Sequence, residues 1–240
     1  MKTTVLTLAL AASSFFAAAQ SKTTTLASTS RPAIAAATTG TVAYQQTMMA
    51  AIAEQAIIKT AEDALANAAK LEGAAAAAPT AWEPRYYLAR TYLKMGSMEK
   101  DSKLKDKAFA QAQTALDQAK QQPGADQAEV LVLQAFLYQG IMMSAPAERG
   151  QEYSAKVSET LKQVKALAPS NPRLHLLLGN ELFYCPTEYG GGADKAKPLY
   201  EQAKALFATF KSATALSPVW GEKTVDAMLD KITGASASAK

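Results

Sequence analysis

One apolar pattern recurs along this chain every 45 residues, and that spacing limits the possible folds more than any other feature. The pattern starts at Leu88, Leu133 and Leu178, and each of these leucines is followed four residues later by a tyrosine or another leucine. A second pattern, built around a leucine, recurs at the same offset from Ala112 and Val157. Periods of roughly 20 to 50 residues are typical of repeat proteins, in which similar units stack and bury a continuous core. Two patterns with one offset therefore predict helical hairpins stacked in a row, which favours a recognition surface over a catalytic pocket.

Helix boundaries can be placed from proline, glycine and capping residues, and no segment has the alternation of a strand. Apolar residues make up 49% of the chain, many of them are alanines, and this mixture favours closely packed helices. Pro84, Pro172 and the Asp126–Glu129 pair mark helix starts, whereas Gly96 and Pro169 mark helix ends. The predicted helices span residues 44–71, 84–95, 101–121, 127–143, 147–167, 172–184, 193–210 and 221–232. The predicted fold class is all-α, with antiparallel helix hairpins stacked as a short solenoid.

The first 19 residues have the features of a secretory signal. Lys2 precedes an apolar run from Val5 to Leu10, and the small residues Ala17–Ala19 give a typical cleavage pattern. The apolar run is too short to cross a bilayer, so we expect no membrane insertion after the signal is removed. These features predict a protein that is periplasmic or secreted.

Composition divides the rest of the chain into three parts. Residues 20–41 are mostly Ser, Thr and Ala, which offer too little large apolar surface to offset the entropy of ordering. We expect a flexible tether there, a helical-repeat domain over residues 42–233 and a disordered tail over residues 234–240. The single cysteine, Cys185, cannot form a disulfide within the chain, so packing alone must stabilise the domain.

The distribution of charge gives no sign of a nucleic-acid partner. The formal net charge is +4, and the basic residues lie near acidic or amide neighbours, as in segment 103–107. The basic stripe with interleaved aromatics that marks many nucleic-acid-binding surfaces is missing. We therefore expect solvated helix faces and no nucleic-acid binding.

The repeated patterns resemble those of the tetratricopeptide-repeat (TPR) family. The first helix of a unit reads Leu-Ala/Gly-x-x-Tyr/Leu, with small residues at Ala89 and Gly179, and the second reads Ala-x-x-x-Leu/Tyr-x-x-Ala, most clearly over residues 196–203. The resemblance covers about residues 86–208 and implies a TPR-like solenoid whose small residues lie where two helices approach most closely. Gln134 departs from this pattern, and each unit has about 11 residues more than the family repeat. The helices or the turns between them must therefore be longer than in the family.

The resemblance also implies a concave groove lined by the first helix of each unit. On that register the candidate partner-binding residues of the groove are Tyr86, Arg90, Tyr138, Arg173, Asn180 and Phe183. Aromatic and arginine side chains are common anchors of interfaces, so we expect a non-catalytic scaffold with a protein or peptide partner. Longer helices could instead rotate this register and place Tyr86 or Tyr138 in the core.

The loop from Cys185 to Gly192 is the most distinctive segment outside the repeats. Its three glycines, Gly190–Gly192, permit backbone conformations that other residues rarely adopt, and the segment resembles the turn within a late repeat of secreted TPR-like proteins. A glycine loop before a helix can also bind an anion, although the Gly-Lys-Ser/Thr motif of phosphate loops is missing. A small molecule or polymer bound near Gly190–Gly192 is the alternative function.

The sequence does not indicate a catalytic or metal site. His175, Cys185 and Glu188 are the one set that suggests metal ligands, and they lack the paired spacing of zinc sites. His175 is the single histidine, so no second histidine is available as a base for a nucleophilic Cys185. We therefore predict no catalytic residues, no metal and no cofactor.

Overall fold

The computed structural model describes residues 31–238, which form helices and loops with no strand among them. The chain divides into two compact units, Met1–Thr38 and Thr39–Lys240, and the description below concerns the second unit. The predicted signal, residues 1–19, and residues 20–30 of the predicted tether lie outside the described residues. Residues 31–41 of the tether range belong to the first helix, and the last helix extends into the range 234–240. The division into signal, tether, domain and tail stays a prediction.

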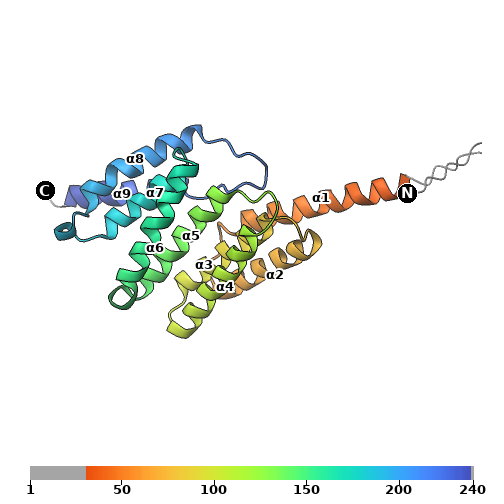
Figure 1. Ribbon diagram of the computed structural model, residues 1–240, viewed down its shortest axis with the longest axis horizontal. Helices are drawn as coiled ribbons and strands as arrows, with labels where there is room; N and C mark the ends of the chain where they lie inside the picture. The colour runs from red at the N-terminus through yellow and green to blue at the C-terminus, as the bar shows by residue number, and fades with distance from the viewer. Residues whose placement is uncertain (1–30, 239–240) are drawn as a thin grey trace, which may run out of the picture. The chain divides into compact units, whose positions relative to one another are not determined.

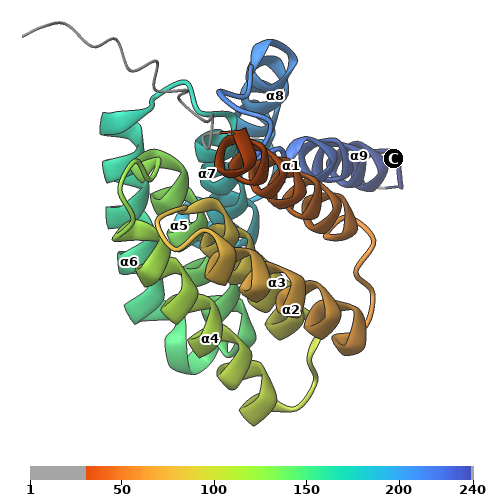
Figure 2. The same cartoon turned by 90° about the vertical axis from the view of Figure 1, so that its right-hand side faces the viewer.

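The described helices form three successive hairpins with further helices at both ends. The elements are α1 (Arg31–Glu54), α2 (Ala61–Ala77), α3 (Glu83–Met98), α4 (Ser102–Lys120), α5 (Gln127–Ser144), α6 (Pro146–Leu167), α7 (Pro172–Tyr184), the 3₁₀ turn η1 (Thr187–Tyr189), α8 (Ala193–Thr209) and α9 (Glu222–Ser238). The hairpins α3–α4, α5–α6 and α7–α8 pack on one another in chain order (Figures 1 and 2). The prediction of an all-α fold built from stacked helix hairpins is confirmed.

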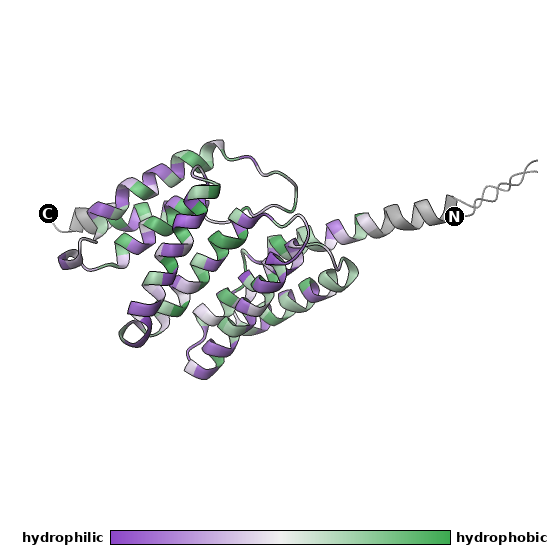
Figure 3. Cartoon of the chain, in the orientation of Figure 1, coloured by the Kyte–Doolittle hydropathy of each residue, from purple (hydrophilic) through white to green (hydrophobic). Residues whose placement is uncertain are grey.

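The repeated apolar positions form the core between the hairpins. Leu88 on α3 and Leu133 on α5 are buried, Leu178 on α7 is partly buried, and Ala112 and Val157 on the second helices are completely buried. Figure 3 shows hydrophobic and hydrophilic residues mixed along the helices; the second helices α4, α6 and α8 have an exposed face, whereas nearly all residues of α5 and α7 are buried or partly buried. The 45-residue spacing is therefore the spacing of equivalent core positions.

Small residues lie where helices approach most closely, as the repeat pattern predicts. A Cβ atom on Gly179 would lie 2.7 Å from the ring of Tyr200, on the second helix of the same hairpin. Likewise, a Cβ atom on Gly96 of α3 would lie 2.6 Å from the ring of Phe109, on the second helix of its hairpin. The prediction that Gly96 ends its helix is therefore wrong: this glycine lies inside α3, where its missing side chain makes room for an aromatic ring.

The predicted helix over residues 44–71 is wrong because two helices occupy this range. The chain leaves the helical path after Glu54, and Thr60 then starts α2 with a capping box in which Thr60 and Asp63 each bind the other's backbone N–H. The side-chain amide of Gln55 donates to the carbonyl of Tyr87 and to the hydroxyl of Thr91, both at 2.7 Å. These bonds to α3 hold the break in place, although no proline or glycine marks it.

Other predicted boundaries agree with the structure. Pro84 and Pro172 occupy the first turns of α3 and α7, and Asn171 caps α7 by accepting from the Arg173 N–H. Asp126 caps α5, whereas the carboxylate of Glu129 turns away from that cap toward α7. Among the described residues, no helix has the length and hydropathy needed to span a bilayer.

Candidate functional site

The long connection between α8 and α9 contacts the side chains that the sequence predicts as a binding groove. We call residues 211–221 the strap; Figure 1 shows it as the blue loop after α8. Trp220 of the strap stacks on Phe136 of α5, with 5.2 Å between ring centroids, and its indole N–H donates to the Tyr86 hydroxyl at 2.8 Å. The Tyr87 hydroxyl lies 3.1 and 3.0 Å from the carbonyl oxygens of Leu216 and Ser217 in the strap.

Tyr86 and Arg173, two of the predicted groove residues, are completely buried. The Arg173 guanidinium donates to the carbonyls of Pro218 and Trp220, and it forms a 3.0 Å ion pair with Glu129. Burial raises the pKa of Glu129 above its usual value, and the charge of Arg173 opposes that rise. These two predicted groove residues therefore bind the chain's own strap, and in this conformation a partner cannot reach them.

The remaining predicted residues do not gather on one free surface. Arg90, on α3, also lies under Trp220, with its guanidinium carbon 5.4 Å from the ring centroid. Tyr138 packs edge-on against Tyr153 of α6. Asn180 bridges Gln139 and Tyr200, and Phe183 lies beneath the ammonium of Lys231 from α9 at 4.8 Å. The structure brings Tyr86, Arg90 and Arg173 together under the strap and separates the other three.

A cavity of about 620 Å³ lies at the other end of these helices, beside the Cys185–Gly192 loop. We call it the α5–α8 cavity, because α5, α6, α7, α8 and the start of the loop line it. Its lining residues are Met142, Met143, Pro146, Gly150, Ser154, Leu178, Glu181, Leu182, Tyr184, Cys185, Pro186 and Leu199. Its volume falls in the usual range of small-molecule sites, roughly 300 to 1,000 Å³.

The wall of the α5–α8 cavity is apolar and contains several soft ligand atoms. Leucine, proline and methionine side chains supply most of the lining, and Met142, Met143 and Cys185 bring thioether or thiol sulfur. Met143 and Tyr184 are 44% and 48% exposed, so apolar surface continues to the mouth of the cavity. Among the lining residues, Glu181 carries the one carboxyl group, and burial raises its pKa to about 7.

The glycine loop fixes the wall of the cavity at Cys185 and Pro186. The N–H of Gly191 donates to the Pro186 carbonyl at 3.1 Å, and the N–H of Gly192 donates to Leu182 at 2.7 Å. A Cβ atom on Gly191 would lie 2.1 Å from the carbonyl oxygen of Cys185, so only glycine fits there without movement. Gly190 and Gly192 have φ of 85° and 107°, in the region that favours glycine. The three glycines therefore fold the loop tightly against the end of α7.

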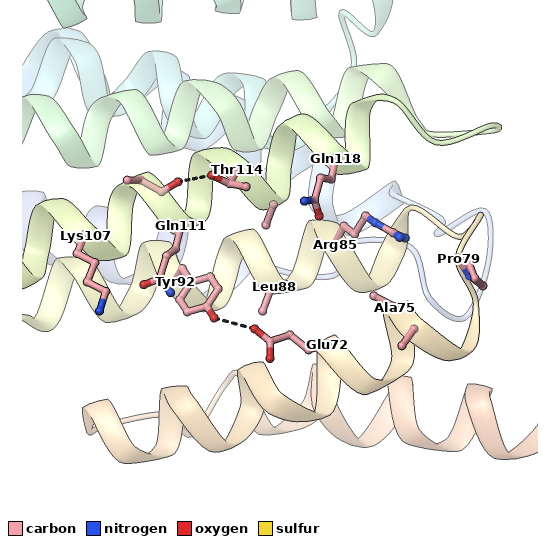
Figure 4. A pocket seen from close by; sticks show the side chains of 13 residues that line it. Glu72, Ala75, Pro79, Arg85, Leu88, Tyr92, Lys107, Gln111, Thr114 and Gln118 are labelled. Carbon is pink, nitrogen blue, oxygen red and sulfur yellow. Dashed lines mark hydrogen bonds between the residues drawn. The ribbon is translucent and has the colours of Figure 1, made fainter.

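A second cavity of about 620 Å³ lies between α2, α3 and α4, and it is more polar. Figure 4 shows Lys107 and Arg85 at opposite ends, with Leu88 and Tyr92 between them. The hydroxyl of Tyr92 binds the Glu72 carboxylate at 3.0 Å. Most of its polar side chains belong to exposed positions, so its wall is less well defined than that of the α5–α8 cavity.

The residues considered as metal ligands do not converge. His175, near the start of α7, is 8% exposed and its Nε2 lies 2.9 Å from the Pro169 carbonyl. Cys185 and Glu188 lie beyond the other end of α7. In the part of the chain that the structure describes, no three His, Cys, Asp or Glu side chains are grouped as a metal site.

The sequence reasoning missed the residues of α5 and α6 that line the cavity. Met142, Met143 and Pro146 are adjacent to a helix break, and the sequence shows nothing that relates them to Leu182 or Leu199. A usable signal was the pair of methionines next to a proline, because flexible methionine side chains are common at adaptable binding surfaces. The alternative interpretation, a ligand near Gly190–Gly192, concerns the same end of the hairpins as this cavity.

Comparison with known proteins gives one informative similarity. No protein-family model matches the chain, and no curated protein matches it. Among solved structures, the HusA haemophore from Porphyromonas gingivalis is similar, with 27% sequence identity and a TM-score of 0.70 over 80% of this chain and 93% of that one. Membership of the TPR family therefore stays a prediction, whereas the helical-hairpin architecture is shared with a haemophore.

The similarity corrects the prediction of a protein or peptide partner. The name haemophore denotes a protein that carries haem, which is a small molecule. The strap also covers Tyr86 and Arg173, which argues against a peptide in the predicted groove. The peptide-binding groove was inferred from the helix register alone, and that inference could not foresee a segment of the same chain over the groove.

Proposed function

We propose that this protein is an exported, non-catalytic haem-binding protein and that the α5–α8 cavity holds the haem. The observation that carries this proposal is an apolar cavity of suitable size with sulfur and phenol groups in its wall. The similarity to a haemophore supports the choice of ligand. The predicted signal over residues 1–19 supports export.

The chemistry of the lining residues fits haem. A tetrapyrrole ring is flat and apolar, and the side chains of Leu178, Leu182 and Leu199 offer apolar contact surface. Methionine, cysteine and tyrosine are side chains that hold haem iron in other proteins. Met142, Met143, Tyr184 and Cys185 are therefore the candidate iron ligands of this site.

The charges around the cavity also suit haem, whose two propionate groups are anionic. The ammonium of Lys231 from α9 lies 5.9 Å from the ring centroid of Tyr184, a lining residue that is 48% exposed, and we expect this cation to attract a propionate. Glu181 is the group that would repel an anion, but its raised pKa keeps a large fraction of it uncharged near neutral pH. Haem can thus enter with its ring against the apolar wall and its propionates toward solvent.

Titration of the purified protein with haemin, followed by the Soret absorption, tests this proposal. Leu182→Arg would place a long charged side chain in the cavity, and we expect it to weaken haemin binding by at least about tenfold, since burying an unpaired charge is costly. Met49→Ala is the matched control, because Met49 is an exposed methionine on α1, and it should bind like the wild type.

A second set of variants identifies the iron ligand. Each of the four candidate side chains is removed in turn, as Met142→Ala, Met143→Ala, Tyr184→Phe and Cys185→Ser. We expect at least one of these changes to shift the Soret maximum, because the iron loses a ligand. Wild-type haemin affinity in Leu182→Arg, with the fold intact by circular dichroism, would refute the proposed site.

A further inference from the structure

A partly buried positive charge without a carboxylate partner lies on α3, away from the α5–α8 cavity. The guanidinium of Arg90 donates from Nη1 to the side-chain carbonyl of Gln55 at 2.6 Å. Its Nε is buried and has no hydrogen-bond partner. Burial lowers the pKa of Arg90, the neighbouring Tyr86 and Tyr87 oppose this change, and the charge of Arg173 adds to it. An arginine in these surroundings stays charged, and among the described residues no carboxylate forms an ion pair with it.

A second cation lies one helical turn further along α3. The ammonium of Lys94 donates to the backbone carbonyl of Gln55 at 2.8 Å, so Arg90 and Lys94 both bind the same residue of the α1–α2 loop. Burial and the charge of Arg90 lower the pKa of Lys94, and the charge of Asp63 opposes this change. The nearby Arg173 has its own partner in Glu129. Arg90 and Lys94 are therefore two neighbouring cations that form no ion pair within the described part of the chain.

We propose that Arg90 and Lys94 form a binding site for a small oxyanion, with the chemistry of a carboxylate or a phosphate. The α1–α2 loop at Gln55 borders this site on one side and Trp220 of the strap borders it on another. An oxyanion would accept hydrogen bonds from the planar guanidinium, which matches carboxylate and phosphate oxygens, and from the mobile ammonium beside it. It would also reduce the cost of a partly buried, unpaired charge.

This site is independent of haem binding. None of the residues Gln55, Arg90, Lys94 and Trp220 lines the α5–α8 cavity, so the proposed function can fail while the anion site stands, and the reverse also holds. The anion site connects three parts of the chain, namely the loop after α1, helix α3 and the strap. An anion bound there would therefore strengthen the link between the strap, α3 and the loop after α1.

Thermal unfolding of the full chain in different salts tests the proposal. We compare inorganic phosphate and acetate with chloride at matched ionic strength and pH, and the two oxyanions distinguish a phosphate ligand from a carboxylate ligand. For a site of this kind, an anion at about ten times its Kd should raise the Tm by about 3 to 6 °C. Above the Kd the rise should follow the logarithm of the anion concentration, whereas the general stabilisation by excluded salts should increase steadily with concentration.

Variants of the two cations make the result specific. Arg90→Met keeps a flexible, unbranched side chain and removes the guanidinium and its charge, so it should abolish the anion-specific rise while leaving the Tm in chloride equal to or above that of the wild type. Arg85→Met is the matched control, since Arg85 lies on the same helix and donates to the Ala81 carbonyl, and it should keep the full rise. Lys94→Met should weaken the anion effect at least about threefold.

A direct reading of the site does not depend on the stability of these variants. In the wild-type protein, the NMR signal of the Arg90 Nε–H should shift on addition of phosphate or acetate and reach a plateau once the anion concentration is well above the Kd. The proposal is overturned if neither anion raises the Tm of the wild type more than that of Arg90→Met. It is equally overturned if the Arg90 Nε–H signal stays unmoved at anion concentrations that raise the Tm.

Discussion

Replacing Trp220 with alanine should release the strap from the inner face of the three hairpins. Trp220 is 8% exposed, although it belongs to a connection between helices. Its ring contacts Phe136 of α5 and the guanidinium groups of Arg90 and Arg173, and its N–H binds the hydroxyl of Tyr86. One side chain thus connects the strap to α3, α5 and α7.

The expected loss of stability follows from these contacts. Truncation of a buried tryptophan to alanine costs about 3 to 5 kcal/mol through lost burial and the cavity left behind. The hydroxyl of the completely buried Tyr86 would also lose its partner, which adds about 1 kcal/mol or more. We therefore expect Trp220→Ala to lower the free energy of unfolding by about 4 to 6 kcal/mol. Trp220→Phe, which keeps the ring contact and removes the N–H, should lose about 1 to 3 kcal/mol.

Urea denaturation followed by far-ultraviolet circular dichroism measures these differences. Val219→Ala is the matched control, because Val219 directly precedes Trp220 and is 61% exposed. This change should alter the free energy of unfolding by no more than about 0.5 kcal/mol. If Trp220→Ala lost less than about 1 kcal/mol, the strap would not be a stable part of the fold. The reasoning about Tyr86 and Arg173 would then fail as well.

Three further changes probe the cavity and the buried ion pair. Gly191→Ala should lower haemin affinity at least about tenfold, because the new methyl group forces the Cys185 carbonyl and the cavity wall to move. Gly73→Ala is the control in the same Soret titration, because Gly73 has open space around it. The pKa of Glu181 is about 7 in the folded state, above its unfolded value of 4.5. The contribution of Glu181 to stability is therefore complete below pH 4.5 and is lost as the pH rises through 7. Glu181→Gln should flatten this part of a Tm profile from pH 5 to 8, and an unchanged slope would contradict the raised pKa of Glu181. Glu129→Gln removes the charge opposite a buried arginine and should cost about 3 to 5 kcal/mol in urea denaturation, whereas a loss below about 1 kcal/mol would show that the pair contributes little.

The order of the helices could be predicted because it depends on local signals. Pro84, Asn171 and the 45-residue recurrence of core leucines are all visible within short windows of sequence, and the structure has helices and core residues at these places. The break before α2 could not be placed, since it depends on hydrogen bonds from Gln55 to residues on α3 that are 32 and 36 positions away. Gly96 was misread because close packing and helix termination both select glycine.

The arrangement at Gln134 illustrates how a departure from the repeat pattern is accommodated. This residue replaces a small one, and its side-chain amide exchanges two hydrogen bonds, of 2.9 and 2.8 Å, with the amide of Gln113 on α4. A polar pair thus takes the place of close apolar contact. The sequence shows the departure, but only the fold shows which residue pairs with it.

The candidate site was harder to predict than the fold because its residues come from separate elements. The strap over Tyr86 and Arg173 joins residues more than 40 positions apart, and no periodicity relates them. The α5–α8 cavity likewise joins the end of α5 to the loop after α7. The glycine loop was recognisable in the sequence, and it lies at the same end of the hairpins as the α5–α8 cavity, but it did not reveal the apolar wall opposite.

Methionine-methyl NMR tests the location of haem binding most directly. The protein, labelled with ¹³C at its eight methionine methyl groups, is titrated with the diamagnetic haem analogue gallium protoporphyrin, whose ring current shifts nearby methyl signals. We expect large shifts for Met142 and Met143 in the cavity wall and none for the exposed Met49 on α1. Signals of Met142 and Met143 that stay in place when the protein is saturated with the analogue would contradict haem binding in the α5–α8 cavity.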